Sequence, residues 1–170
     1  MSPARFIATS DGFLRGPGVA FRCALGKGGI MPACDKREGD GASPAGIWQM
    51  KRLFYRPDRI EKPRSGLPCI ALKPHDAWCD APQHPLYNRP VTRPFTASHE
   101  RLWRDDHIYD VIVELSHNDN PVVPDLGSAI FFHLAHDDYR PTQGCVAISQ
   151  PDMADLLGLA SIGTELEIAL

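Results

Sequence analysis

The sequence predicts a mainly β-strand domain with two or three short helices. Its 170 residues suit a single hydrophobic core, and we assign residues 4–169 to one domain. The chain contains 14 Gly and 16 Pro, more turn-forming residues than average usage, which favours short strands joined by turns. Most apolar residues fall in short runs bounded by Gly, Pro or Asp, a pattern typical of strands.

The N-terminal half is predicted to contain short strands around one long loop. Residues 6–9 and 19–25 form an opening hairpin across Gly-rich turns. Residues 26–46 are rich in Gly, Ala and charged side chains, and this loop is long enough to be functional. It leads into the strand-like segment 47–50. Residues 56–95 contain many prolines, which exclude a long helix and indicate an irregular insertion with one or two edge strands.

The C-terminal half is predicted to contain most of the buried sheet. Four strands are expected, at residues 109–115, 129–134, 143–148 and 164–168. A short helix is expected over 98–104, capped by Ser98. The pattern from Ser149 to Asp152 is typical of a capping box with Pro inside the first turn. It predicts a second helix that ends near Leu157.

Charge and hydropathy exclude several classes of protein. The formal net charge is −3, and no cluster of Lys and Arg is large enough to indicate a nucleic-acid partner. No segment has the length of apolar sequence that a transmembrane helix needs. The first 25 residues carry Arg5, Arg15 and Arg22 among short apolar pieces, which is unlike a secretory signal. The residues themselves therefore give no support for export.

The sequence does not match a phosphate-binding loop or a metal site, although parts of each are present. Gly26–Gly29 resembles part of a phosphate loop, but Phe21 stands where the first glycine of that motif belongs. His133, His136 and Cys145 could supply metal ligands, yet residues three apart on a strand point to opposite faces. No metal and no organic cofactor are predicted.

Cys145 and His133 are the strongest candidates for chemistry. Cys145 lies between Gly144 and Val146, shortly before a predicted helix, where backbone N–H groups and the helix dipole would lower the pKa of a thiol. The N–H groups of Gly144 and Cys145 could stabilise an oxyanion, and His133, at the end of a strand, could act as base. A buried structural Cys beside a His satisfied by the backbone explains the same residues, and local chemistry leaves both interpretations open.

Several blocks together resemble the catalytic domain of L,D-transpeptidases, the YkuD-type family of bacterial cell-wall enzymes. The family has a Thr/Ser-Pro-x-Gly loop after a Gly-Lys pair, a His at a strand end, a Ser/Thr shortly before Gly-Cys, and a final alternating strand. The matching residues are Gly26–Lys27, Ser43–Trp48, His133, Thr142–Val146 and Gly163–Ile168. The sequence Gly-Cys-Val-Ala places the chain nearest to one branch of this family.

The resemblance implies a β-sandwich of mixed sheets with a cleft, and a cysteine acyl transfer. In the family, the cysteine attacks the carbonyl of the diamino acid at position three of a tetrapeptide stem and expels D-Ala. The acyl group then passes to an amine of a second stem, which forms a 3→3 cross-link. Cys145 would be the nucleophile, His133 would accept and return the proton with a backbone carbonyl orienting it, and Gly144 would contribute to the oxyanion hole. The implied partners are peptidoglycan stem peptides, the implied location is the periplasm or cell envelope, and no cofactor is needed.

The chain departs from the family where the substrate is held. Leu134, Gln143 and Ala147 stand where most members have Gly, His and an Arg or Asn, so the chain lacks a bidentate carboxylate contact there. We assign substrate binding to Thr142, Gln143 and Asn118. A packing role is expected for other residues that resemble branch features: Trp78–Asp80, Tyr87–Asn88, Glu100, Trp103 and His117.

Two other functions remain open at this level. An L,D-carboxypeptidase, or a hydrolase of stem-peptide linkages, would use the same Cys145 and His133 with water as acceptor. A non-catalytic module that binds the cell wall would use Cys145 only for structure. The sequence does not fix a cytoplasmic or exported location, an oligomeric state, or a disulfide pairing of Cys23, Cys34, Cys69 and Cys79.

Overall fold

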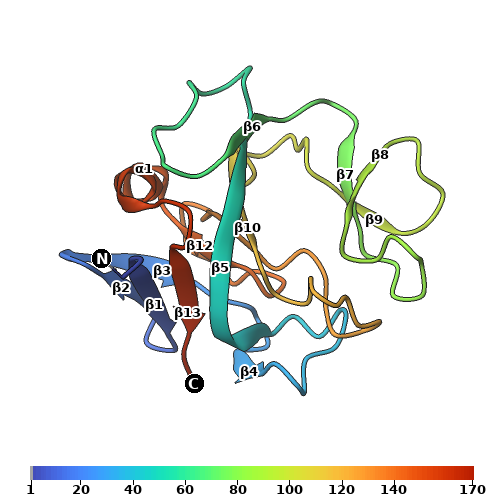
Figure 1. The fold of residues 1–170 in the computed structure, drawn as a ribbon, viewed down its shortest axis with the longest axis horizontal. Helices are drawn as coiled ribbons and strands as arrows, with labels where there is room; N and C mark the ends of the chain where they lie inside the picture. The colour runs from blue at the N-terminus through green and yellow to red at the C-terminus, as the bar shows by residue number, and fades with distance from the viewer. Residues whose placement is uncertain (1) are drawn as a thin grey trace.

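The computed structural model of the chain describes residues 2–170, which form thirteen strands and one α-helix (Figure 1). The strands of the main body are β1 (Arg5–Thr9), β2 (Phe13–Gly16), β3 (Val19–Ala24), β4 (Ile30–Pro32), β5 (Ser43–Tyr55), β6 (Cys69–Ala71), β10 (Val111–Leu115), β11 (Phe131–Leu134), β12 (Val146–Ile148) and β13 (Glu165–Ile168). A separate small sheet contains β7 (Asp76–Cys79), β8 (Pro90–Thr92) and β9 (His99–Arg101). The helix is α1 (Gln150–Leu159).

β3 and β5 each pair with different strands along their two parts, and this folds the main sheet back on itself. The first part of β5, Gly46–Gln49, pairs with β13, and the second part, Met50–Tyr55, pairs with β10. In the same way, β3 pairs with β2 through Val19–Arg22 and with β12 through Cys23–Ala24. β3 and β5 therefore connect the two halves of one continuous ten-stranded sheet, so the β-rich fold is confirmed but the main body is not a classical sandwich of two separate sheets. Strand pairing is mixed, because β1 is parallel to β13 and β11 is parallel to β12.

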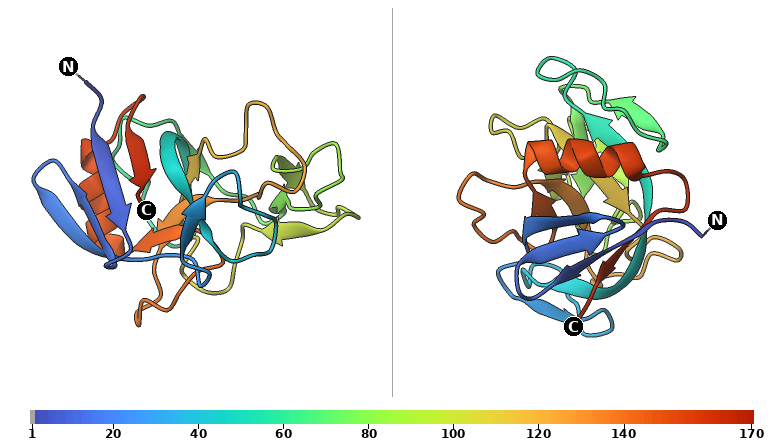
Figure 2. Two further views of the ribbon diagram at one scale, coloured as in Figure 1. Left: turned by 90° about the horizontal axis from the view of Figure 1, so that it is seen from below. Right: turned by 90° about the vertical axis from the view of Figure 1, so that its left-hand side faces the viewer.

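The main hydrophobic core lies between the two halves of this sheet and under α1. Strand alternation turns Phe132 of β11 and Val146 of β12 inward, and both side chains are fully buried in this core. Met153 and Leu156 of α1 complete it from one side. Burial of each such side chain stabilises the fold by roughly 1.5–3 kcal/mol. Figures 1 and 2 show α1 at the opposite end of the molecule from the small sheet.

The alternate residues of β11 and β12 point outward and are covered by the insertion. Phe131 and Cys145 belong to a second buried cluster, together with Trp78, Leu102 and Tyr109. Trp78 packs edge-on against Phe131 with 5.0 Å between the ring centroids. The Pro-rich insertion and the segment after it thus bury a sheet face that would otherwise meet solvent.

Most predicted elements are confirmed, with several differences. β4 and the first residues of β5 lie within the predicted loop 26–46, and the insertion contains three strands, β6, β7 and β8, where one or two were expected. The opening segment is a three-stranded meander, because Phe13–Gly16 forms β2 between the two predicted strands. The predicted helix over 98–104 is wrong: His99–Arg101 is strand β9, whose Glu100 pairs with Trp78 of β7. The backbone hydrogen bonds offered by β7 outweigh the helix preference of this short segment.

The helix after β12 is confirmed. Ser149 caps it by accepting a hydrogen bond from the Asp152 N–H, and α1 runs two residues beyond the predicted end. It is the one helix among residues 2–170, where two or three were expected. No helix in this described range has the length and apolar character needed to span a bilayer.

Candidate active site

A cavity of about 550 Å³ lies on the outward face of β11 and β12. Cys145, His133, Thr142 and Gln143 all line it, so the structure brings four of the predicted site residues together. The loop between β11 and β12 forms one side, and the loop after β4 and the small sheet form the other. The cavity therefore lies between the core sheet and the insertion.

Cys145 is the last residue before β12 and its thiol is held by the backbone. Its Sγ lies 3.2 Å from the carbonyl oxygen of Ala129, to which the thiol donates, and 3.3 Å from the N–H of Phe131, which donates to the sulfur. The residue is only 7% exposed. In this resting state the thiol is thus anchored at the start of β11.

The predicted lowering of the Cys145 pKa is wrong. Burial raises the pKa of the thiol to about 12, and the carboxylate of Glu100 adds to the rise. The helix that was expected to stabilise a thiolate begins at Gln150, beyond the whole of β12, so its N-terminus lies at the far end of that strand. The Cys145 thiol is therefore neutral at physiological pH.

His133 has the orientation of a general base. Its Nδ1 lies 2.9 Å from the carbonyl oxygen of Leu134, and because a carbonyl only accepts, Nδ1 carries the hydrogen and Nε2 keeps the lone pair. The expected backbone carbonyl that orients the ring is thus present. Burial lowers the His133 pKa to about 4, so the ring is neutral at physiological pH. The ring of Tyr109 packs edge-on against it, with 5.1 Å between centroids.

Strand register places the two residues on one face. His133 is paired with Ala147 across the parallel β11–β12 ladder, and Cys145 comes two residues before Ala147. Since side chains two apart on an extended segment point to the same side, Cys145 and His133 are diagonal neighbours on the cavity face. Both side chains line the same cavity, and the hydrogen bonds of the thiol are to the backbone of Ala129 and Phe131 rather than to the imidazole.

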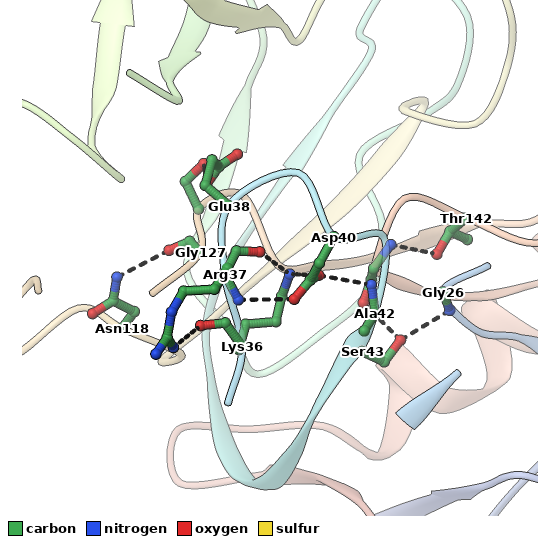
Figure 3. Close-up of polar contacts among 12 residues, drawn as sticks. Gly26, Lys36, Arg37, Glu38, Asp40, Ala42, Ser43, Asn118, Gly127 and Thr142 are labelled. Atoms are coloured by element: carbon green, nitrogen blue, oxygen red, sulfur yellow. Dashed lines mark hydrogen bonds and ion pairs between the residues drawn. The ribbon is translucent and has the colours of Figure 1, made fainter. Parts of the chain in front are cut away.

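Three backbone segments cross next to Cys145. Gly144 has φ +132°, and a Cβ there would lie 2.8 Å from the carbonyl oxygen of Ala42. A Cβ on Gly26 would lie 2.3 Å from the carbonyl oxygen of Gly41. The hydroxyl of Ser43 accepts from the Gly26 N–H at 2.9 Å and donates to the Gly144 carbonyl at 2.7 Å. Figure 3 shows the Gly26 contact of Ser43 and the neighbouring loop.

This crossing gives a physical role to Ser43, which from the sequence alone was only part of a family motif. Ser43 was noted as part of a Ser-Pro-x-Gly block, without a function of its own. Its hydroxyl joins the end of β3 to the segment that carries Cys145. A Ser or Thr is needed because the group must both accept and donate.

Thr142 acts on the nucleophile loop rather than only on a ligand. Its Oγ1 accepts from the Gly144 N–H at 3.1 Å and donates to the Cys145 carbonyl at 2.7 Å. The Gly144 N–H that was assigned to an oxyanion hole is therefore bonded to Thr142 in this structure, and its oxyanion role stays a prediction. Gln143 lines the cavity between them, and its role in substrate binding stays a prediction.

Asn118 is not at this cavity, which corrects its predicted placement. Its side-chain amide donates to the carbonyls of Val123 and Gly127, and its Oδ1 accepts from the Val123 N–H. It adopts φ +49° and organises the loop that follows β10. Figure 3 shows Asn118 and Thr142 at opposite ends of the loop that follows β4.

Most of the charged residues that line the cavity were not predicted from the sequence. Lys36, Arg104 and Arg140 bring cations to the cavity, whereas the family Arg position is Ala147 in this chain. Glu38, Asp80 and Glu100 bring carboxyl groups. Glu100 and the Trp78–Asp80 block were singled out in the sequence but assigned to packing, because nothing local to them indicated that the insertion folds over the nucleophile.

Comparison with known proteins agrees with the motifs. A family model described as the L,D-transpeptidase catalytic domain, YkuD, matches residues 12–168. No curated protein matches the sequence. Two solved structures are similar to the chain: L,D-transpeptidase 1 of Mycobacterium tuberculosis, at 11% identity and a TM-score of 0.47, and an L,D-transpeptidase from Mycobacterium smegmatis, at 10% identity and a TM-score of 0.49. Each match covers 99% of this chain, which spans 60% and 59% of those two chains.

The Ser43 crossing predicts a measurable effect on stability. Ser43→Ala leaves the buried Gly26 N–H and Gly144 carbonyl without their partner, so the free energy of unfolding should fall by about 1–3 kcal/mol. Urea denaturation would measure this, with the exposed Ser10→Ala as control. Equal stability of the two variants would contradict the structural role of the hydroxyl.

The raised thiol pKa predicts slow alkylation of Cys145. All five thiols are free among the described residues, and Cys34 is the exposed one. Near neutral pH iodoacetamide should modify Cys34 first. The Cys145 rate should climb by about tenfold per pH unit up to at least pH 10 without a plateau, because the thiol stays protonated below about pH 12. Peptide mass spectrometry would follow each site. Faster labelling of Cys145 than of Cys34 at pH 7 would show that its pKa is not raised.

Proposed function

Because the chain belongs to the YkuD family of L,D-transpeptidase catalytic domains, we propose that it transfers acyl groups between peptidoglycan stem peptides. The donor is a tetrapeptide stem, from which D-Ala is released, and the acceptor is an amine of a second stem, which gives a 3→3 cross-link. The observation that carries this proposal is the placement of Cys145 and His133 on one face of adjacent parallel strands, at the wall of a single cavity.

The first step is acylation of Cys145. As the sulfur attacks the carbonyl carbon of the third stem residue, His133 Nε2 accepts the thiol proton and later gives it to the leaving D-Ala amine. A pKa of about 12 for the thiol and about 4 for the imidazole favours the neutral pair before substrate binds. Proton transfer is therefore coupled to attack rather than completed in the free protein. The backbone N–H groups of Gly144 and Cys145 are the proposed donors to the oxyanion.

The charged lining supports a stem peptide as ligand. Arg140 and Arg104 can meet the terminal carboxylate of the donor, a contact that Ala147 has no group to make. Gln143 is placed to bind the peptide backbone. Since stem peptides lie outside the cytoplasmic membrane, we place the working protein in the periplasm or cell envelope, with peptidoglycan stems as its partners.

The first experiment incubates wild type and Cys145→Ala with purified disaccharide-tetrapeptide and follows the products by mass spectrometry. A dimer formed with loss of D-Ala by wild type alone supports transpeptidation. Tripeptide without dimer indicates the carboxypeptidase, in which water takes the acyl group. No Cys145-dependent product favours another wall substrate or the non-catalytic binding module.

The role of His133 predicts both a rate and a pH limit. His133→Ala should lower single-turnover release of D-Ala by about 10²–10⁴-fold while the protein stays folded. In wild type, this release should persist in mild acid and be lost as pH falls through about 4, since His133 is an active base only while neutral. The matched variant His136→Ala, on the same cavity, should retain the release. The reverse result would make His136 the base.

A further inference from the structure

One wall of the cavity carries three carboxyl groups from separate segments. Glu38 comes from the loop after β4, Asp80 directly follows β7, and Glu100 lies on β9. Glu100 is paired with Trp78 across the β7–β9 ladder, and Asp80 comes two residues after Trp78. Asp80 and Glu100 are therefore neighbours on the same face of the small sheet.

These carboxyl groups have hydroxyl partners rather than cations. Glu38 Oε2 accepts from Tyr87 at 2.6 Å and from Ser128 at 2.9 Å, and Glu100 accepts from the hydroxyl of Tyr109. Asp80 Oδ1 is buried without a hydrogen-bond partner. None of Glu38, Asp80 and Glu100 forms an ion pair with any other residue in the range 2–170.

None of the three cations that line the cavity forms an ion pair with these carboxyl groups. Lys36 pairs with Asp40, Arg104 pairs with Asp106, and Arg140 pairs with Asp138. Glu38, Asp80 and Glu100 are half-buried, and carboxylates held partly away from water without an ion-pair partner are costly, so this wall favours a ligand that brings a positive charge. Cys145 lines the same cavity as this wall, and the charge of Glu100 contributes to the raised pKa of its thiol.

We propose that this wall binds the acceptor amine as an ammonium group, and that Glu100 takes a proton from it before it attacks the acyl group on Cys145. This rests on the proposed transpeptidase function and specifies how its second substrate is chosen. Glu38 and Asp80 attract and orient the ammonium, and Glu100 is the base of the second step. An acceptor whose amine is acetylated should not be used.

The proposed step is balanced. The ammonium group gives one proton to the Glu100 carboxylate and becomes a neutral amine. Its nitrogen forms a C–N bond with the thioester carbonyl carbon, and the C–S bond to Cys145 breaks. The second proton lost by the nitrogen passes through His133 to the departing sulfur. The products are an amide, a neutral Cys145 thiol and a protonated Glu100.

Glu100 is suited to this role by its surroundings. Burial raises its pKa to about 7, the Tyr109 hydroxyl and Arg104 lower it, and the charges of Asp80 and Glu38 raise it. A base is most effective when its pKa lies near the working pH, which His133 does not match. The ring of Tyr109 also packs against that of His133, so the two bases of the cavity share one support.

The test measures the two steps separately on the folded protein. With enzyme in excess, single-turnover release of D-Ala from disaccharide-tetrapeptide reports acylation, and dimer formation with added disaccharide-tripeptide reports transfer. Glu100→Gln keeps the shape of the side chain but cannot take a proton. It should lower dimer formation at pH 7 by about 10²-fold or more and leave D-Ala release within about threefold of wild type. Glu61→Gln, outside the cavity, should change neither rate.

The pH profile separates a base from a merely structural residue. Wild-type dimer formation should fall as pH drops through about 7, whereas D-Ala release persists to near pH 4. Tyr109→Phe removes a hydrogen bond that lowers the Glu100 pKa, so the midpoint for dimer formation should move to higher pH. This shift decides the question if Glu100→Gln does not fold.

Four results would contradict the inference. A ratio of dimer to released D-Ala that is unchanged in Glu100→Gln would overturn it, as would equal use of the acetylated acceptor or an unmoved midpoint in Tyr109→Phe. A wild type that releases D-Ala but makes no dimer would also remove the acceptor step. A wild type without Cys145-dependent release of D-Ala would instead refute the proposed function itself.

Discussion

The close crossing of three backbone segments at Gly26, Ala42–Ser43 and Gly144 is the constraint on which the site depends. Two glycines allow the chains to approach more closely than any side chain would permit, and the Ser43 hydroxyl satisfies a donor on one segment and an acceptor on another. The crossing fixes where the loop from β11 ends and hence where Cys145 enters β12. The position of Cys145 is thus determined by residues far apart in the sequence.

The site also depends on the two faces of the β11–β12 pair, which contact different parts of the molecule. β11 and β12 give one face to the main core and the other to the insertion, so the same short ladder holds Phe132 in the interior and His133 at the cavity. The insertion buries that second face and, with it, both reacting groups. Burial raises the thiol pKa and lowers the imidazole pKa, so both groups are neutral in the free protein. In the proposed reaction the proton therefore moves from the thiol to the imidazole only when a substrate is bound.

Local sequence patterns were sufficient to predict the elements whose structure agrees with their own residue preferences. The strand at 111–115, the final strand at 165–168 and the Ser149 cap follow from alternation and capping chemistry. The segment around Glu100 was predicted as a helix because its pairing with β7, about twenty residues earlier in the chain, leaves no local trace.

The candidate site shows the same limit. Cys145 and His133 were identifiable from residue type and order, and the structure places them on one face. The environment of Cys145 was misjudged, because a helix near in sequence was taken to be near in space although β12 separates them. Asn118 was assigned to substrate binding, but its hydrogen bonds belong to its own loop. Carboxyl groups delivered by the insertion could be located only once the fold placed them.

The parallel pairing of the first and last strands has a mechanical consequence. Arg5–Ala8 of β1 lies alongside Glu165–Ile168 of β13 in parallel register. If the chain is pulled at the start of β1 and at the end of β13, the two strands are driven past each other along their length. The hydrogen bonds between them then carry the load together in shear instead of opening one after another. Resistance to such a force is set by the rate of unfolding rather than by equilibrium stability. If this domain were attached to other structures at both ends, it would therefore unfold slowly under tension, and its hydrophobic core would lose its packing only after β1 and β13 separate.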